Sequence, residues 1–297
     1  MLTFKINKDE TACEVTKCDK KATGTVTIPD TYSGKVVVGI GKEAFKGCIN
    51  MTDVTIPDNV EKIGSYAFYG CTGLTNIVIP DSVKKIGNGV FMKCTGLTNI
   101  VIPDSVKTAG ESIFQGCTSL KSAVLSRNMK ITGDKAFFGC TSLVSVTIPD
   151  GVKEIGYFCF GYCKGLSSVT IPKSLTEYNF AFQFCTGLTS VTFQKGVKVI
   201  GLGAFQDCTG LTSITIPEGV EGIQNWAFSG CTGLTSVTIP KTVVKMGGGV
   251  FGGCDKQLTI NVLGLCEKPE AWPSEWNCKC KVIWDFGGKN IVQEAGA

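Results

Sequence analysis

Apolar and polar positions follow one fixed order along most of the chain. Residues 70–87 read GCTGLTNIVIPDSVKKIG, and residues 93–110 read KCTGLTNIVIPDSVKTAG, so almost the same pattern returns 23 residues later. Such a step indicates a repeat protein, in which one structural unit is copied along the chain.

Ten copies align on this pattern, at steps of 23 residues with one step of 22 after the seventh start. The copies begin at Ile40, Ile63, Ile86, Ala109, Thr132, Ile155, Tyr178, Ile200, Ile223 and Met246. Each carries one phenylalanine of a column formed by Phe45, Phe68, Phe91, Phe114, Phe137, Phe160, Phe182, Phe205, Phe228 and Phe251. Each also carries one cysteine of a column formed by Cys48, Cys71, Cys94, Cys117, Cys140, Cys163, Cys185, Cys208, Cys231 and Cys254. We therefore expect stacked coils in which like residues lie above one another.

Each unit contains one predicted strand. Residues 74–79, LTNIVI, are rich in β-branched residues, so Ile77 and Ile79 should point inward and Val78 outward, to the concave face. Pro80 ends the strand because it has no N–H group to donate.

The rest of the unit closes the coil. Residues 81–87 predict a turn that re-enters the core, and residues 65–70, SYAFYG, predict a single helical turn with Phe68 facing inward. A 23-residue unit has no room for a longer helix. The sequence thus predicts an α/β solenoid with a parallel concave β-sheet and short helical turns on the convex side. Each phenylalanine should rest on the next, and burial of each contributes about 1.5–3 kcal/mol.

Different segments close the two ends. We expect an N-terminal cap with an irregular first repeat at 1–39, the ten repeats at 40–262, a C-terminal cap at 263–287, and a tail or linker at 288–297. The tryptophans expected to cover the last phenylalanine are Trp272, Trp276 and Trp284.

Composition narrows the functional classes. Histidine is absent, which excludes Ser-His-Asp and Cys-His nucleophile pairs and histidine-bound zinc. The formal charge of +4 is well mixed, so nucleic acid is not expected as a partner. No apolar run reaches the about 18–20 residues that span a bilayer. The opening MLTFKINKDE does not read as a signal peptide, which leaves a cytoplasmic protein or one whose export signal lies outside this sequence.

The pattern IGxxAFxxCxxLxxVxIPxxV over about residues 22–262 resembles the BspA-like leucine-rich repeats of bacterial and protist proteins. The resemblance implies a right-handed, curved solenoid, the leucine-rich repeat superhelix. It also implies a surface-exposed or secreted protein, for which adhesion and binding of host proteins are proposed. The Trp-rich ending resembles the C-terminal cap of that family. The matching columns are core residues, so the resemblance implies no catalytic residue and no cofactor.

The column cysteines are expected to be buried structural thiols. Cap disulfides are expected, if the protein is exported, between Cys13 and Cys18 and between Cys266 and either Cys278 or Cys280. The motif CKC lacks the second cysteine pair or histidine of a zinc site, so no metal is expected there.

The residue after the strand proline varies in charge. Early copies place an aspartate there, at Asp58, Asp81 and Asp104. Later copies place a cation there, at Arg127, Lys173, Lys195 and Lys241. No continuous calcium row therefore exists, and turn formation is the preferred role of the aspartates. Copy four also replaces proline by Ser126, and copy seven by Gln194, which indicates local bends or contact sites.

Two surfaces are candidate binding sites. On the concave side an uncharged stripe consists of Asn76, Val78, Asn99, Val101, Ser122, Val124, Ser145, Thr147, Ser168, Thr170, Ser190 and Thr192. On the convex side an aromatic patch consists of Phe138, Tyr157, Phe158, Tyr162, Tyr178, Phe180 and Phe184. Phe158 should stack on Phe180, and Tyr162 on Phe184, because the members of each pair hold equal positions in adjacent copies. An exposed aromatic patch would mark a partner surface.

Two functions remain open. The first is a non-enzymatic, adhesin-like module at the cell surface or outside the cell, which binds surface or matrix proteins of a host or neighbouring cell, or glycans. The second is an intracellular scaffold or self-assembling structural protein, favoured by the missing signal and the many free-thiol candidates. An enzyme would need converging Lys, Asp or Glu side chains, and the repeat pattern shows none.

Overall fold

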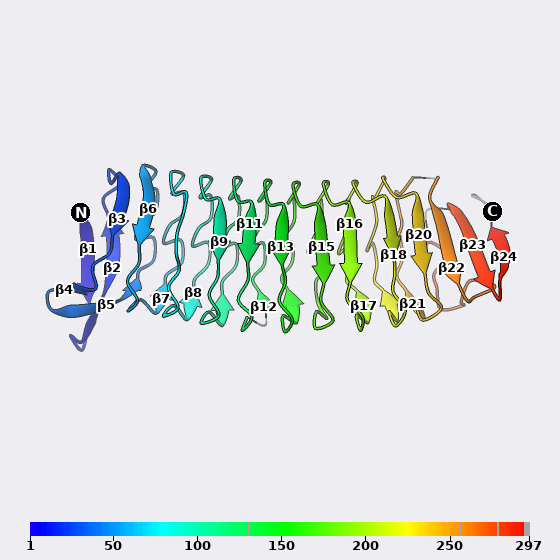
Figure 1. Cartoon of the computed structure of the whole chain (residues 1–297), viewed down its shortest axis with the longest axis horizontal. Helices are drawn as coiled ribbons and strands as arrows, with labels where there is room; N and C mark the ends of the chain where they lie inside the picture. The colour runs from blue at the N-terminus through cyan, green and yellow to red at the C-terminus, as the bar shows by residue number, and fades with distance from the viewer. Residues whose placement is uncertain (130, 256, 278, 294–297) are drawn as a thin grey trace. The chain divides into compact units, whose positions relative to one another are not determined.

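The computed structural model describes residues 1–129, 131–255, 257–277 and 279–293. They form a β-solenoid of stacked coils, each made of short strands joined by turns (Figure 1). The chain divides into two compact units, Met1–Val152 and Lys153–Ala297, here unit 1 and unit 2. Residues that are one repeat apart lie beside each other within each unit, as the sequence predicted.

One face of unit 1 is made of parallel strands at the positions that the sequence predicted, here the long ladder. Its strands are β3 (Gly24–Thr27), β6 (Met51–Thr55), β9 (Asn99–Val101), β11 (Ser122–Val124) and β13 (Ser145–Thr147). Asn99 lies opposite Ser122, and Ser122 opposite Ser145, so the register follows the sequence repeat. Residues 74–79 occupy the corresponding place between β6 and β9, but they do not form the predicted strand.

The sequence did not predict a second set of strands, here the short ladder. In unit 1 it consists of β5 (Lys35–Ile40), β7 (Lys62–Ile63), β8 (Lys85–Ile86), β10 (Thr108–Ala109) and β12 (Ile131–Thr132). Residues 81–87 were expected to form only a turn, yet Lys85 and Ile86 pair in parallel with the coils before and after them. Stacking brings the same two residues of each turn to strand spacing, and two residues alone carry no strand pattern.

Unit 2 repeats both ladders. Its long ladder consists of β15 (Ser168–Ile171), β16 (Ser190–Phe193), β18 (Ser213–Thr215), β20 (Ser236–Ile239), β22 (Thr259–Leu263), β23 (Lys281–Phe286) and β24 (Lys289–Gln293). Its short strands are β14 (Glu154–Ile155), β17 (Val199–Ile200), β19 (Gly222–Ile223) and β21 (Lys245–Met246). Ser168 pairs with Ser190 and Ser213 with Ser236, which includes the one shortened repeat.

The prediction of short helical turns is wrong. The described residues contain no helix, and therefore none that could cross a membrane. In the turn at 64–70, Ala67 N–H donates to Gly64 O within the coil, whereas Phe68 N–H donates to Val90 O of the next coil at 2.9 Å. The backbone N–H groups of this turn thus alternate between acceptors in the same coil and acceptors in the neighbouring coil. A helix would keep all of these donors within one coil and leave the stacking direction without hydrogen bonds.

The predicted aromatic core is confirmed in both units. All ten column phenylalanines are fully buried. In unit 1 the rings from Phe45 to Phe137 stack with centroids 4.8–5.4 Å apart. In unit 2 the rings from Phe160 to Phe251 stack at 5.2–5.7 Å. These spacings lie in the favourable range for offset-stacked rings, so each coil is held to the next through its core.

The first part of unit 1 and the last part of unit 2 carry extra strands. β1 (Leu2–Ile6) pairs antiparallel with β2 (Ala12–Cys18), β2 runs parallel to β5, and β4 (Thr31–Tyr32) pairs with β5. In the last part of unit 2, β24 pairs antiparallel with β23, so the segment expected to be a tail contains a strand.

The cap tryptophans behave as predicted. Trp272, Trp276 and Trp284 are buried, and Trp276 meets the ring of Phe251 edge-on at 6.1 Å. The indole thus replaces the phenylalanine of a further coil, and it shields the end of the aromatic core from water.

Candidate functional site

The column cysteines are structural. The column thiols are buried, and most of them donate a hydrogen bond to the carbonyl of a column phenylalanine one coil earlier, as Cys117 does to Phe91 O at 3.0 Å and Cys208 to Phe182 O at 3.2 Å. Burial raises the pKa of the Cys117 and Cys208 thiols well above the usual value. The thiols therefore stay protonated near neutral pH and are poor nucleophiles. Within the described chain no group of three or more Asp, Glu or Cys residues could hold a metal ion.

The predicted disulfides are not formed among the described residues. Cys13 and Cys18 are both reduced, and they lie at positions five residues apart on β2. An extended strand separates such residues by roughly 16 Å, far beyond the about 7 Å that a disulfide spans. Cys266 is exposed and reduced, so it forms no bond with Cys280. Cys278 lies outside the described residues.

Apart from Tyr178, the members of the aromatic patch are half-buried or exposed. As predicted, Phe158 stacks on Phe180 at 5.5 Å and Tyr162 on Phe184 at 4.5 Å. Phe138, a member placed in unit 1, is partly buried. Tyr157 and Tyr162 are exposed on the surface of unit 2.

Tyr178 does not belong to that patch. Its side chain is fully buried, and its hydroxyl donates to Val199 O at 2.9 Å. The first position of the repeat unit is an inward position, which Ile holds in most copies, so the tyrosine enters the core with its one polar atom satisfied.

The aromatic patch follows a backbone rule that sequence reasoning missed. Phe158, Phe180 and the two further aromatics Tyr66 and Trp226 occupy the same position of their turns, and all four have φ between 52° and 59°. For residues other than glycine this left-handed conformation is unfavourable by about 1–2 kcal/mol. Several other copies place glycine at this position, for example Gly89, Gly203 and Gly249. The sequence did contain a signal for this conformation, because the aromatic residues and the glycines occupy one common position of the repeat.

The predicted concave stripe is on the surface in both units. In unit 2 it is polar: Ser168, Thr170, Ser190 and Thr192 are exposed on β15 and β16, in register across the two strands. This face has hydroxyl groups and no bulky anchor, and the residues present there fit a solvated sheet.

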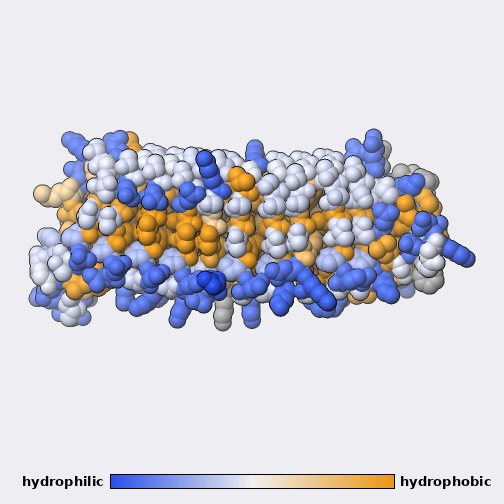
Figure 2. Space-filling view, viewed as in Figure 1, coloured by the Kyte–Doolittle hydropathy of each residue, from blue (hydrophilic) through white to orange (hydrophobic). Residues whose placement is uncertain are grey.

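In unit 1 part of the same stripe is apolar. Val78, Val101 and Val124 take the place of threonine in three consecutive coils, and these residues are 70%, 60% and 46% exposed, respectively. Val101 lies opposite Val124 in the sheet. Figure 2 shows a band of hydrophobic surface along this face, with polar residues on one side and charged side chains on the other. Exposed apolar surface that continues across three coils is typical of an interaction site.

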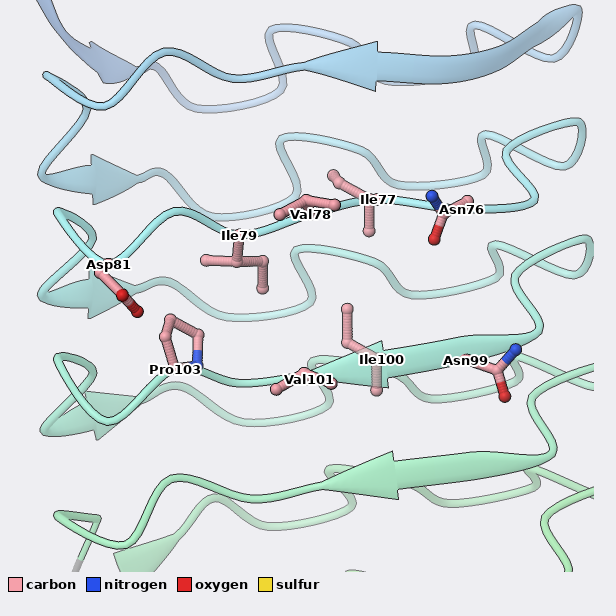
Figure 3. Close-up of a pocket in the computed structure, with 9 residues that line it drawn as sticks. All are labelled: Asn76, Ile77, Val78, Ile79, Asp81, Asn99, Ile100, Val101 and Pro103. Atoms are coloured by element: carbon pink, nitrogen blue, oxygen red, sulfur yellow. The ribbon is translucent and has the colours of Figure 1, made fainter.

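The valines form the floor of a shallow groove. One hollow of about 310 Å³ lies between residues 76–81 and 99–103, and a second of about 470 Å³ continues from Val101 past Val124 to Asp150. We call these two hollows together the valine groove. Figure 3 shows Val78 and Val101 in the middle of the first hollow. Asn76 and Asn99 lie at one end, and Asp81 and Pro103 lie at the other.

The two long sides of the valine groove differ in charge. The uncharged side carries Asn99 and Ser122, whose Oγ donates to Asn99 Oδ1 at 2.7 Å, together with Asn76 and Ser145. The opposite side carries the residues that follow the strand proline, or Ser126 in its place, namely Asp81, Asp104, Arg127 and Asp150. In the sequence the Asn and Ser residues and the Asp and Arg residues belong to different parts of the repeat unit. The fold brings the two sets to opposite sides of the same groove.

Copy four departs from the repeat without disturbing the groove. Ser126 replaces the strand proline, is fully buried, and donates through Oγ to Val106 O at 2.8 Å. Arg127 pairs with Asp104, at 3.2 Å between Nε and Oδ2, and its amide donates to Asp104 Oδ1. The predicted irregularity is thus absorbed by local hydrogen bonds.

Several solved structures are similar to this chain. A leucine-rich repeat protein from Bacteroides ovatus is 27% identical, with 96% of this chain and 98% of that chain covered and a TM-score of 0.39. A leucine rich cell surface protein from Faecalibacterium prausnitzii is 25% identical, with 93% and 96% covered and a TM-score of 0.40. The pneumococcal vaccine antigen PcpA is 21% identical, with 88% and 80% covered and a TM-score of 0.57, which shows a similar fold. No curated protein matched the sequence.

The repeat itself identifies the family. The profile described as "BspA type Leucine rich repeat region (6 copies)" matches residues 38–166 and 130–259, more than half of the chain. These segments contain the phenylalanine and cysteine columns that form the core of both units. The chain therefore belongs to the BspA-type leucine-rich repeat family.

Proposed function

We propose that this chain is a non-enzymatic, adhesin-like module, at the cell surface or outside the cell, that binds a protein of a host or neighbouring cell through the valine groove. The observation that carries the proposal is the run of three exposed valines, Val78, Val101 and Val124, where other copies of the repeat have threonine. The fold tolerates threonine at this position, so the valines are not required for stacking. Their exposure is explained by a partner that covers them.

The shape of the site favours binding over catalysis. The groove is shallow and open, and its polar side chains are short amides, hydroxyls and carboxylates at the rim. The sequence has no histidine to act as a general base near neutral pH. The surface location is supported by membership of the BspA-type family, for which the sequence resemblance implies surface exposure or secretion.

Binding can be tested with a matched variant. The purified chain is applied to an array of extracellular-matrix and cell-surface proteins, beside the triple variant Val78→Thr, Val101→Thr and Val124→Thr. Threonine is native at this position in other copies, so the variant should fold with an unchanged circular dichroism spectrum. We expect the chain to bind at least one component and the variant to lose it. Equal binding by both proteins, or no binding by the chain, would contradict the proposal.

A second function, the intracellular scaffold, is favoured by one observation: the cysteines of the described chain, numerous as they are, form no disulfide among themselves. Reduced thiols are typical of a reducing compartment, and they fit an intracellular scaffold. A thiol count on protein purified from its native source separates the two functions. Oxidised cap cysteines would exclude the scaffold, and reduced cap cysteines would favour it.

A further inference from the structure

We infer that the valine groove takes an extended peptide segment of a partner protein, in which aliphatic side chains stand beside lysine or arginine. The inference rests on the proposed function and adds the chemistry of the ligand. It is carried by three observations: the dimensions of the groove, the sign of its charge, and the contrast with the same face in unit 2.

The dimensions fit a single extended chain. Val78, Val101 and Val124 lie in consecutive coils, and neighbouring strands are about 4.8 Å apart. The exposed valine floor is therefore roughly 10 Å long, about the length of three residues of an extended peptide. Proline side chains extend the lining of the groove, at Pro103 in both hollows and at Pro149 in the second. A narrow apolar strip of this size accepts two or three aliphatic side chains.

The charges that line the groove are mainly negative. They are Asp81, Asp104 and Asp150, with Arg127 as a single cation. Arg127 is already paired with Asp104. Asp81 and Asp150 are exposed, and among the described residues neither belongs to an ion pair. Two carboxylates at the rim are therefore available to a cation on the ligand.

The two lysines that follow Asp81 most closely in sequence do not cancel this charge. Lys84 pairs with Glu61 at 2.8 Å, and Lys85 lies on β8 of the short ladder. Neither side chain lines the groove. The opposite side of the groove consists of amides and hydroxyls, so the only fixed charge next to the apolar floor is on the aspartate side.

Unit 2 provides an internal comparison. Its stripe has threonine where unit 1 has valine, at Thr170, Thr192, Thr215 and Thr238. The residues after its strand proline, or after Gln194 in its place, are Lys173, Lys195, Glu218 and Lys241. Loss of the apolar floor thus coincides with replacement of most acidic residues by lysine. The repeat folds with either set, so folding alone does not require valine and aspartate to occur together. The contrast holds between the two units as wholes and not copy by copy, because in unit 1 Asp150 follows Thr147 and Arg127 follows Val124. A ligand that uses both the apolar floor and the acidic side would explain why unit 1 has both.

Opposite charges at a solvent-exposed rim mainly speed association and select the partner, while apolar contact supplies most of the affinity. Binding should therefore weaken with salt without being lost, because the Debye length falls from about 10 Å at 0.1 M to about 3 Å at 1 M.

The inference is tested by selection from a phage-displayed library of random 12-residue peptides on the full chain, after subtraction on the Val78→Thr, Val101→Thr, Val124→Thr variant. We expect the selected peptides to contain Val, Ile or Leu at alternating positions. On average each selected peptide should contain at least one more Lys or Arg than a peptide of the starting library. A selected peptide is then synthesised and measured by fluorescence anisotropy against the chain and against Asp81→Lys with Asp150→Lys. Lysine is native at that position in unit 2, so this variant should fold.

We expect the double lysine variant to bind the basic peptide at least tenfold more weakly, and to bind better when glutamate replaces the basic residues of the peptide. Lys173→Asp in unit 2 should leave the affinity unchanged. Selected peptides that are acidic or neutral, or equal affinity for the double variant, would overturn the inference. Those results leave the proposed function intact as long as partner binding is lost in the threonine variant, so the two failures can be told apart.

Discussion

The ring of Tyr66 covers Gly89 of the next coil. A methyl group at Gly89 would lie 2.5 Å from Cε1 of Tyr66, and both residues have the left-handed backbone conformation, with φ of 59° and 57°. The same relation joins Phe180 to Gly203, and Trp226 to Gly249. In these three pairs the ring lies over a glycine that has no side chain to displace it, whereas Phe158 stacks instead on the ring of Phe180.

Gly89→Ala should destabilise the protein through this contact. Overlap with the Tyr66 ring should cost about 1–3 kcal/mol, and the left-handed alanine about 1 kcal/mol more. The midpoint of urea unfolding, followed by circular dichroism, measures the change. In the double variant Tyr66→Ala with Gly89→Ala the overlap is absent, so only the backbone part should remain. A double variant no more stable than Gly89→Ala alone would show that the ring is not the cause.

Phe114→Ala should remove one layer of the aromatic core. The ring stacks on Phe91 at 5.3 Å and on Phe137 at 5.1 Å, and it is fully buried. We expect a loss of about 3–5 kcal/mol, with unfolding in two steps because the repeats on either side are uncoupled. Calorimetry measures both effects. Val101→Thr is the control for an exposed position, and it should change stability by less than about 0.5 kcal/mol.

Thiol labelling should separate the two classes of cysteine. Cys266 is exposed and reduced, whereas the column thiols are buried in the core. In a Cys278→Ser background, a maleimide at pH 7.5 should modify one thiol quickly under native conditions, and Cys266→Ser should abolish that fast phase. The remaining thiols should react only at the rate of unfolding. Rapid modification of several thiols in the double serine variant would show that the core is open.

Stability should fall at alkaline pH. Burial raises the pKa of Cys185 to about 12, and it raises the pKa of Cys231 well above the usual value. In the unfolded chain a thiol loses its proton near pH 8.5, so above that pH the unfolded state binds fewer protons than the folded state. The free energy of unfolding should be constant from pH 6 to 8 and should then decrease, by about 1.4 kcal/mol per pH unit for each such thiol, until the folded pKa is reached.

Urea unfolding at pH 7, 9 and 10.5 in a reducing buffer measures this dependence. Cys185→Ala removes one titrating thiol, so its stability should depend less steeply on pH above 9. An unchanged slope in that variant would mean that other groups, such as lysines, cause the alkaline loss.

The sequence by itself determined the repeat and the inward columns. Phe114, Cys117 and their equivalents recur at one spacing, and only stacking in register can bury every member of such a column. The role of Trp276 also followed from sequence, because a stack must end on a residue that replaces the missing neighbour. These conclusions depend on periodicity, which the chain shows directly.

Only the tertiary structure decided the turns and the surface. Whether residues 64–70 form a helix depends on whether Phe68 N–H donates within its own coil or to the next, and the local sequence permits both. Likewise Val78 and Asp81 were assigned to a strand and to a turn, and only the stacking of adjacent coils makes them the floor and the side of one groove. The position of Tyr178 was misjudged because a large polar aromatic was assigned to the surface, whereas the stack supplied a carbonyl for its hydroxyl in the core. The conformation of the turn, the lining of the groove and the position of Tyr178 all depend on contacts between coils, which no single repeat contains.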